Sequence, residues 1–275
     1  MSAQFSCLWC GRPHTPRTPD ELELFARLCS DCVGRAQDNE FLRYRLREGL
    51  RARAAAQAAP DDEMKAYYAA RAPEYDEVYA GAGLAPLERA VFQADLDAAT
   101  LWLDRLPLSG EIVELAAGTG WWSPLLAQKG ELWLYDAVEQ PLDLARRRLV
   151  AHGLRAHIHV RDAWAEPERR VDALFTGFWL SHVRSDRLAD FLALARRWLK
   201  PGGSYAFIDE LPDPAYTPVV DERQQRELKD GRRFSITKVY RTAEQIGRAL
   251  RAAGFADIEL ESTSRHFVLG AAKAP

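Results

Sequence analysis

Short apolar runs alternate with amphipathic segments along most of this chain. Helical spacing of apolar side chains predicts helices at residues 86–105, 187–198 and 242–253. In the first of these, the predicted apolar face is Leu87, Val91, Leu96, Leu101 and Leu103. The short runs predict strands at residues 112–115, 131–136, 157–162, 171–178, 204–209, 256–261 and 266–270. This alternation is typical of an α/β fold whose mostly parallel sheet carries helices on both faces.

A glycine-containing loop follows the first of these strands. Gly118 and Gly120 let the backbone turn sharply and come close to a ligand, which a Cβ at either position would obstruct. We expect a helix to begin at about Thr119 and to present unpaired N–H groups to that ligand. Glu114 lies inside the apolar run, where a carboxylate is costly unless something pairs with it. The next strand ends in Asp136, where a nucleotide ribose would be held.

The loop differs from a dehydrogenase fingerprint, because Ser123 stands where that pattern has a third glycine. The pattern Glu-x-x-x-Gly-x-Gly, from Glu114 to Gly120, followed by an acid that closes the next strand, resembles instead the class I S-adenosylmethionine-dependent methyltransferases. A strand that ends in Asp162-Ala-Trp, a Lys-Pro-Gly-Gly turn that ends at Gly203, and a terminal β-hairpin resemble the same family. The resemblance covers residues 64–272 and implies a Rossmann-like sheet of seven strands with helices on both faces.

The resemblance also implies where S-adenosylmethionine would bind. The implied cofactor-binding residues are Glu114, Ala116, Gly118, Thr119, Gly120, Asp136, Asp162, Ala163, Trp164 and Phe178. Tyr68 and Tyr75 share one helical face and are similar to a lid segment that covers the cofactor in many small-molecule methyltransferases. The alternative for these two residues is an aromatic stripe that packs on the core.

Candidate acceptor residues follow the fourth strand, whose carboxyl end faces the transferred methyl in the resembled family. His182 titrates near neutral pH, so it would remove a proton from the acceptor or orient it. A structural interpretation makes the same histidine a helix cap or a core group. Trp179 and Glu210 are further candidate substrate contacts. The basic residues that would either hold an acidic substrate or flank a loop are Arg232, Arg233 and Lys238, around a predicted edge strand at residues 234–240.

All four cysteines lie within the first 32 residues, as the pairs Cys7/Cys10 and Cys29/Cys32. Two C-x₂-C pairs with eighteen residues between them match the spacing of a structural zinc site with four thiolate ligands. Disulfides are the competing interpretation, but a cytosolic chain has no use for them. We therefore expect one zinc ion in a zinc-ribbon-like module at residues 1–34, where it would serve folding and not chemistry.

Three segments are predicted after this module. They are a connecting helix at residues 35–60, a helical lid or extension at 61–105, and the S-adenosylmethionine-binding domain at 106–275. The net charge of −3 gives no basic field that would attract nucleic acid or an anionic membrane. No apolar run reaches the length of a membrane span, and signal-peptide regions are lacking, so we expect a cytoplasmic enzyme. Formation of a homo-oligomer stays open.

The predicted function is methyl transfer from S-adenosylmethionine to an oxygen or nitrogen atom of a small molecule. One alternative is an RNA methyltransferase that uses the zinc module and an arginine-rich helix at residues 35–60 to bind RNA. The acidic net charge, and the lack of an Asn-Pro-Pro-Tyr-type motif at residues 176–179, argue against a nucleic-acid partner. A second alternative is a non-catalytic scaffold of the same fold, against which Gly118, Asp136 and Asp162 argue.

Overall fold

The computed structural model describes residues 5–6, 12–14, 62–212 and 222–275. The chain divides into two compact units, residues 1–59 and 60–275. In the first unit, β1 (Phe5–Ser6) pairs antiparallel with β2 (Pro13–His14). Cys7, Cys10, Cys29 and Cys32, and the predicted connecting helix, lie outside the described residues. The zinc module therefore stays a prediction, as do the domain boundaries.

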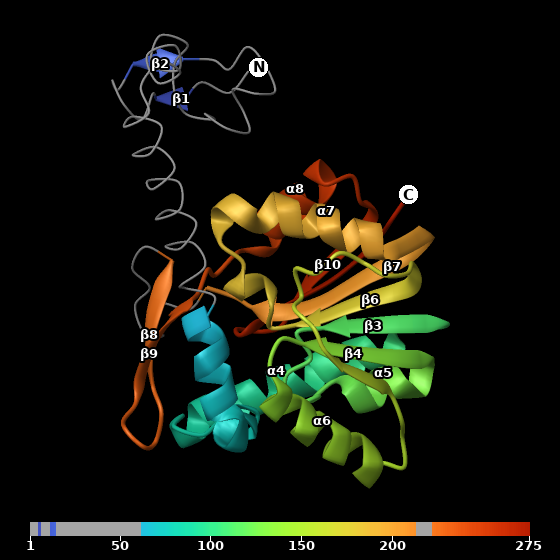
Figure 1. Cartoon of the computed structure of the whole chain (residues 1–275). Helices are drawn as coiled ribbons and strands as arrows, with labels where there is room; N and C mark the ends of the chain where they lie inside the picture. The colour runs from blue at the N-terminus through green and yellow to red at the C-terminus, as the bar shows by residue number, and fades with distance from the viewer. Residues whose placement is uncertain (1–4, 7–11, 15–61, 213–221) are drawn as a thin grey trace, which may run out of the picture. The chain divides into compact units, whose positions relative to one another are not determined.

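The second unit is built on a seven-stranded sheet, as predicted (Figure 1). Its strands are β3 (Glu111–Leu115), β4 (Glu131–Asp136), β5 (His157–Val160), β6 (Val171–Gly177), β7 (Leu199–Glu210), β10 (Ala256–Ser262) and β11 (Phe267–Lys273). Their order is β10-β11-β7-β6-β3-β4-β5. The five strands from β7 to β5 are parallel, whereas β11 runs antiparallel to both of its neighbours. The strand order reverses direction between β3 and β6, where open α/β sheets bind ligands at the carboxyl ends of the strands.

Helices cover both faces of the sheet (Figure 1). One face carries α4 (Pro86–Arg105), α5 (Ser123–Lys129) and α6 (Glu139–Ala151), and its core includes Phe92, Leu126 and Leu142. The other face carries α7 (Leu188–Trp198) and α8 (Ala243–Ala252), with Trp198 and Leu250 in a second core. Two short 3₁₀ turns, η2 (Leu180–His182) and η3 (Ser185–Arg187), join β6 to α7. Within the described part of the chain, no helix is long and apolar enough to cross a membrane.

The face of α4 that packs on the sheet differs from the predicted one. Leu87 and Leu101 are 79% and 58% exposed, so they do not belong to the core. The buried positions are Phe92, Leu96, Ala99 and Leu103, which follow one another at helical spacing. Leu96 and Leu103 are buried as predicted. The rest of the prediction was wrong because it followed the branched aliphatic residues and overlooked Phe92, Ala99 and Trp102, which are also buried.

The helix after the glycine loop also begins later than predicted, at Ser123 and not at Thr119. Gly118 and Gly120 have φ values of +56° and +70°, in the left-handed region that a right-handed helix cannot include. The loop therefore stays non-helical until Ser123. The next residue, Pro124, is favourable in the first turn of a helix because it needs no N–H partner there.

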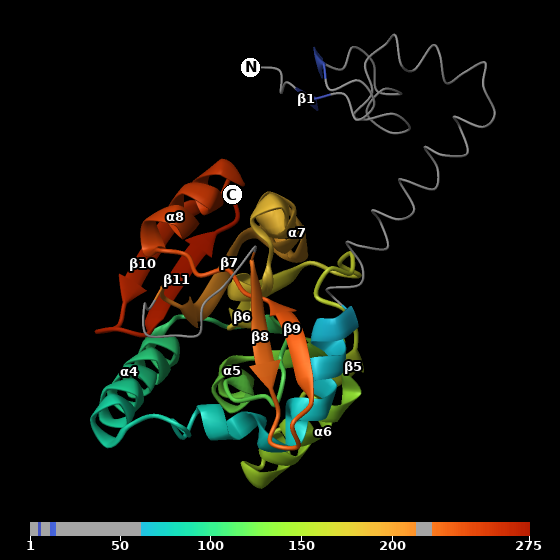
Figure 2. The same ribbon diagram turned by 90° about the vertical axis from the view of Figure 1, so that its left-hand side faces the viewer.

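A helical segment and a small hairpin lie side by side beyond the main sheet (Figures 1 and 2). Residues 62–71 are helical and continue into η1 (Ala72–Val78). The hairpin consists of β8 (Arg223–Glu227) and β9 (Arg233–Thr237). The predicted edge strand at residues 234–240 is thus β9, which ends at Thr237 and pairs with β8 in a separate sheet. Met64 and Tyr67 pack against Leu228 and Ile236 and so join the two elements.

Candidate active site

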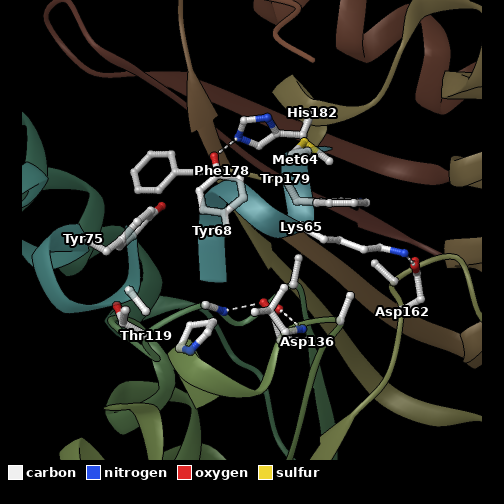
Figure 3. Close-up of a pocket in the computed structure, with 18 of the residues that line it drawn as sticks. Met64, Lys65, Tyr68, Tyr75, Thr119, Asp136, Asp162, Phe178, Trp179 and His182 are labelled. Atoms are coloured by element: carbon white, nitrogen blue, oxygen red, sulfur yellow. Dashed lines mark hydrogen bonds and ion pairs between the residues drawn. The ribbon is translucent and has the colours of Figure 1, made fainter. Parts of the chain in front are cut away.

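A pocket lies at the carboxyl ends of four parallel strands and is covered by the segment 62–78 (Figure 3). After β3 and β4 it is lined by Ala116, Gly118, Thr119, Asp136, Ala137, Val138 and Pro141. After β5 and β6 it is lined by Asp162, Ala163, Trp164, Gly177, Phe178, Trp179 and His182. The covering segment contributes Met64, Lys65, Tyr68, Ala72 and Tyr75. The structure therefore brings ten of the twelve predicted cofactor-binding residues to one pocket, and Trp179 and His182 with them.

Asp136 ends β4 with its carboxylate fixed by the loop opposite. Its Oδ2 accepts a hydrogen bond from the N–H of Gly118 at 2.9 Å, and its Oδ1 accepts one from the N–H of Val138 at 2.8 Å. Burial raises the pKa of Asp136 to about 6, because it outweighs these two hydrogen bonds, and the nearby Asp162 raises it further. Each carboxylate oxygen keeps a second lone pair, so Asp136 could accept hydrogen bonds from two vicinal hydroxyl groups.

The two glycines of the loop have different roles, contrary to the prediction that both approach a ligand. A Cβ at Gly118 would meet nothing within 4 Å, and this residue lines the pocket. A Cβ at Gly120 would lie 2.7 Å from the Cβ of Ala145, so this glycine permits close packing against α6. Ala116 and Phe178, which line the pocket at the ends of β3 and β6, have φ values of +52° and +56°. Such backbone strain in non-glycine residues is concentrated at functional sites.

Glu114 lies beneath the loop and does not line the pocket. It is 1% exposed, and its carboxyl group accepts a hydrogen bond from the Ser123 hydroxyl at 2.6 Å. Burial raises the pKa of Glu114 to about 8, although the Ser123 hydrogen bond opposes this shift. The residue that departs from the dehydrogenase pattern, Ser123, is therefore the hydrogen-bond partner that Glu114 needs in the core.

Asp162, the predicted adenine-side acid, is held from both sides. The N–H of Trp164 donates a hydrogen bond to Oδ1 at 2.9 Å, and the Nζ of Lys65 lies 2.8 Å from Oδ2 (Figure 3). Lys65 belongs to the covering helical segment, so this ion pair joins the cover to the end of β5. The ion pair is partly exposed, so its contribution to stability is about 1 kcal/mol or less.

A second group of contacts holds η1 against the glycine loop. The hydroxyl of Thr119 donates a hydrogen bond to the Oδ1 of Asp76 at 2.6 Å. Arg148 of α6 forms an ion pair with the same carboxylate and donates to the carbonyl of Thr119 at 3.1 Å. Tyr79 stacks on Trp121 with ring centroids 4.0 Å apart. The covering segment is thus joined to α6 and to the loops after β3 and β5.

His182 lies between the covering segment and β9. Its Nδ1 lies 2.7 Å from the carbonyl oxygen of Thr237, and its Nε2 lies 2.7 Å from the hydroxyl of Tyr68. A carbonyl only accepts, so Nδ1 carries the proton and Nε2 accepts from Tyr68. Burial lowers the pKa of His182 to about 3, and the positive charge of Lys238 lowers it further. The imidazole is neutral at physiological pH.

A second pocket adjoins the first and shares Tyr68, Tyr75, Phe178 and His182 with it. Glu210 lines the second pocket only, where its Oε2 lies 2.6 Å from the Nζ of Lys238. Three further side chains with polar or charged groups also line this pocket: Arg71, Arg226 and Tyr67. Of the basic residues named in the sequence analysis, Lys238 is 2% exposed and lines the second pocket. Arg232 and Arg233 line neither pocket and pair with Asp230 and Glu227 on the hairpin surface.

Lys65 and Arg226 line the two pockets but were not predicted from the sequence as site residues. Lys65 lies three residues before Tyr68, so helical spacing would have placed it on the same face. Arg226 stands in a polar strand that carries no recognisable motif, and only the pairing of β8 with β9 brings it to the second pocket. In the part of the chain that is described, no group of His, Cys, Asp or Glu residues could hold a metal ion.

Comparisons with known proteins agree with this fold. A family model described as a methyltransferase domain matches residues 112–203. Over 123 residues the chain is 33% identical to the ubiquinone/menaquinone biosynthesis C-methyltransferase UbiE of Coxiella burnetii. The aligned region covers 42% of this chain and 48% of that protein. The chain therefore spans about half the length of the curated relatives it matches.

Two solved structures of DhpI extend the likeness beyond the family model. The DhpI–SAH complex superposes with a TM-score of 0.65 at 27% identity and covers 77% of this chain and 95% of DhpI. The DhpI–SAM–HEP complex gives a TM-score of 0.64 at 28% identity, with 78% and 98% covered. The chain thus contains a segment that matches a methyltransferase domain, in a fold similar to that of these complexes with SAM and SAH. The predicted class I fold is confirmed.

Proposed function

We propose that this chain transfers a methyl group from S-adenosylmethionine to an oxygen or nitrogen atom of a small-molecule acceptor. The observation that supports this most directly is the junction of the two pockets, which share Tyr68, Tyr75, Phe178 and His182. A cofactor in the first pocket and an acceptor in the second would meet at these side chains. The relatives named above are methyltransferases, or complexes with SAM or SAH, and their names support the same reaction.

The residues of the first pocket fit S-adenosylmethionine. Asp136 keeps free lone pairs for the two ribose hydroxyls, and Gly118 leaves open space where a side chain would stand. Ala163 and Trp164 would contact the adenine, with Asp162 beside them as an acceptor for its amino group. Phe178 and Tyr75 would lie near the sulfonium, since aromatic faces attract a positive charge.

When bound, S-adenosylmethionine supplies an electrophilic methyl group on a sulfonium. The protein's own contribution is to align the acceptor with that methyl group and to exclude water, and both effects depend on the covering segment. Lys65, Tyr68 and Asp76 join this segment to the ends of β5 and β6 and to the glycine loop. We propose that it acts as the predicted lid, with Tyr68 and Tyr75 on its inner face.

The role that we propose for His182 is to orient the acceptor through Tyr68. Both ring nitrogens of His182 already have hydrogen-bond partners, and its lowered pKa makes the imidazole a weak base. Because the Tyr68 hydroxyl donates to Nε2, its oxygen lone pairs remain available to accept a hydrogen bond from the acceptor. Trp179 would form an adjoining wall of the pocket.

A second candidate is methyl transfer to carbon, because the curated relative at 33% identity is named a C-methyltransferase. Carbon and heteroatom products can be distinguished by carbon-13 NMR after transfer of a labelled methyl group. The RNA methyltransferase alternative depended on residues 35–60, which lie outside the described residues. It stays a hypothesis that no contact in the described structure favours.

The test is calorimetric titration of the full chain with S-adenosylmethionine and with S-adenosylhomocysteine. We expect binding with a Kd in the micromolar range, and Asp136→Ala should weaken it roughly 10- to 100-fold, as loss of hydrogen bonds to a charged group would. Asp143→Ala is the matched control, because Asp143 lies on α6 and pairs with Arg146 at the surface. Absence of heat with either ligand would exclude the proposed function, and equal losses in both variants would exclude the role of Asp136.

A further inference from the structure

The second pocket carries an excess of positive charge. Among the described residues, three basic side chains line it (Arg71, Arg226 and Lys238), against one carboxylate, Glu210. Lys238 pairs with Glu210 at 2.6 Å and donates to the Ser181 hydroxyl at 3.0 Å, so these two charges neutralise each other. The proximity of Lys238 also lowers the pKa of Glu210 despite its burial, so this carboxylate is ionised at neutral pH. Two cations, Arg71 and Arg226, remain.

Neither of these arginines pairs with a carboxylate among the described residues. Arg71 donates to the Tyr67 hydroxyl at 2.6 Å and lies over the rings of Tyr67 and Tyr75, at 5.6 and 5.5 Å from their centroids. Arg226 comes from the other side of the pocket, on β8, and within the described structure its buried Nε has no hydrogen-bond partner. A guanidinium offers five N–H donors in a fork that matches a carboxylate or phosphate group. Both arginines are partly exposed, so a ligand can reach them, and an anion would supply the acceptor that the buried Nε of Arg226 lacks.

Among the described residues that line the second pocket, no side chain is suited to remove a proton. His182 is neutral and uses both nitrogens, and Glu210 is held by Lys238. Burial raises the pKa of the Tyr68 hydroxyl well above its ordinary value, so that this group stays protonated. A hydroxyl or amine acceptor would need its proton removed, whereas an oxyanion is already a nucleophile at neutral pH.

We infer that the acceptor is an oxyanion, a carboxylate or a phosphate-type group, bound by Arg71 and Arg226 and methylated on its oxygen. The inference rests on the proposed function and narrows its substrate class. In the reaction, a lone pair of the oxyanion forms the new O–C bond to the methyl carbon. The S–C bond breaks and its electron pair stays on sulfur, which becomes a neutral thioether. The acceptor loses one unit of negative charge in the resulting ester, and no proton moves.

The experiment measures binding of small probes to the full chain saturated with S-adenosylhomocysteine. Benzoate and phenylphosphonate are the anionic probes, and benzamide is the neutral probe of the same shape; their rings suit the aromatic walls formed by Tyr67, Phe178 and Phe267. We expect at least one anion to bind more tightly than benzamide by about tenfold or more, as charge-assisted hydrogen bonds would produce. The stronger of the two anions distinguishes a carboxylate from a phosphate-type acceptor.

Three variants test the assignment of the arginines. Arg226→Gln and Arg71→Gln should each weaken anion binding about tenfold and leave benzamide binding unchanged. Arg233→Gln is the control, because it removes the same charge from the same hairpin at a side chain that is 77% exposed and lines neither pocket. Affinity for S-adenosylhomocysteine and the melting temperature verify that each variant is folded. If Arg71→Gln does not fold, Arg226→Gln alone carries the test.

The outcomes separate this inference from the proposed function. Normal cofactor binding with no preference for either anion would overturn the oxyanion inference and leave the proposed function in place. Equal losses in Arg226→Gln and Arg233→Gln would overturn it as well, because they would indicate a general field and not a site. Failure of the wild-type chain to bind S-adenosylhomocysteine would overturn both.

Discussion

The hydroxyl of Tyr68 and the Nε2 of His182 lie 2.7 Å apart, although 114 positions separate them in the chain. Since the Thr237 carbonyl fixes the proton on Nδ1, Nε2 is an acceptor and Tyr68 is the donor. Both residues line both pockets, so this hydrogen bond joins the covering segment to the end of β6 where the two pockets meet. The hydrogen bond occupies the Nε2 lone pair of His182, which a general base would need to accept a proton from the acceptor.

Removing the Tyr68 hydroxyl should therefore affect the reaction more than cofactor binding. We expect Tyr68→Phe to lower kcat by ~10-fold, the effect of one lost hydrogen bond of about 1–1.5 kcal/mol, and to change the Kd for S-adenosylhomocysteine by less than about threefold. Because the pKa of His182 is lowered to about 3, this residue is neutral over the whole range from pH 5 to 9. The kcat profile should show no ionisation of His182 in that range.

His182→Ala and His152→Ala provide the comparison for this prediction. His152 is exposed at the C-terminal end of α6 and lines neither pocket, so its replacement should leave kcat unchanged. His182→Ala should lower kcat by a similar factor at every pH. A wild-type ionisation near pH 6–7 that disappears in His182→Ala would show that the histidine acts as a base and would contradict the positioning role.

The sequence predicted most of the residues that line the first pocket, because strand ends are marked by local patterns. Asp136 and Asp162 each follow a short apolar run, and parallel strands bring their carboxyl ends to one edge of the sheet. Gly118 was identified for the same reason. Gly120 was assigned to the ligand, although it packs on Ala145, because a glycine signal does not distinguish a ligand from a neighbouring helix.

The acceptor side could not be predicted in the same way. Arg226 reaches the second pocket only because β8 and β9 form a separate hairpin, which no local pattern specified. Arg233 and Lys238 lie at opposite ends of the same strand and looked equivalent in the sequence. In the structure the Arg233 side chain is 77% exposed, whereas that of Lys238 is 2% exposed. Their difference is set by the register of β9 and by the position of Glu210 at the end of β7.

Glu114 should make the protein less stable as the pH rises. Burial raises its pKa from 4.5 to about 8, so between these values the folded state keeps a proton that the unfolded state has released. Asp136, raised from 3.8 to about 6, adds to the effect in the lower part of this range. We expect the melting temperature to fall as the pH rises from about 5 to 8. Glu114→Gln, which resembles the protonated acid, should reduce this dependence.

The measurement is thermal unfolding at pH 6, 7 and 8 for the wild type, Glu114→Gln and Glu139→Gln. Glu139 is exposed in the first turn of α6, so its replacement should keep the wild-type dependence. If Glu114→Gln and the wild type lost the same stability between pH 7 and 8, another group would be responsible.

The zinc prediction is tested by elemental analysis of chain purified under reducing conditions without chelator. We expect one zinc ion per chain, lost when Cys10 and Cys32 are both replaced by serine. Removal of the metal should leave the affinity for S-adenosylhomocysteine unchanged, because the described residues that line the first pocket all belong to the unit of residues 60–275. Protein that contains no zinc under these conditions would exclude the module.

The pair of Lys238 and Glu210 should be the most sensitive ionic contact of the site. Lys238 is 2% exposed and its partner is 25% exposed, so replacing one member leaves a largely buried charge without compensation. We expect Lys238→Met to lower the free energy of unfolding by ~3 kcal/mol in urea titrations. The double variant Lys238→Met/Glu210→Gln should recover most of the loss, since it removes both charges and keeps the volume. Arg233→Met, which breaks the exposed pair with Glu227, should cost less than about 1 kcal/mol. A double variant no more stable than Lys238→Met would show that Lys238 stabilises the hairpin by packing and not by its charge.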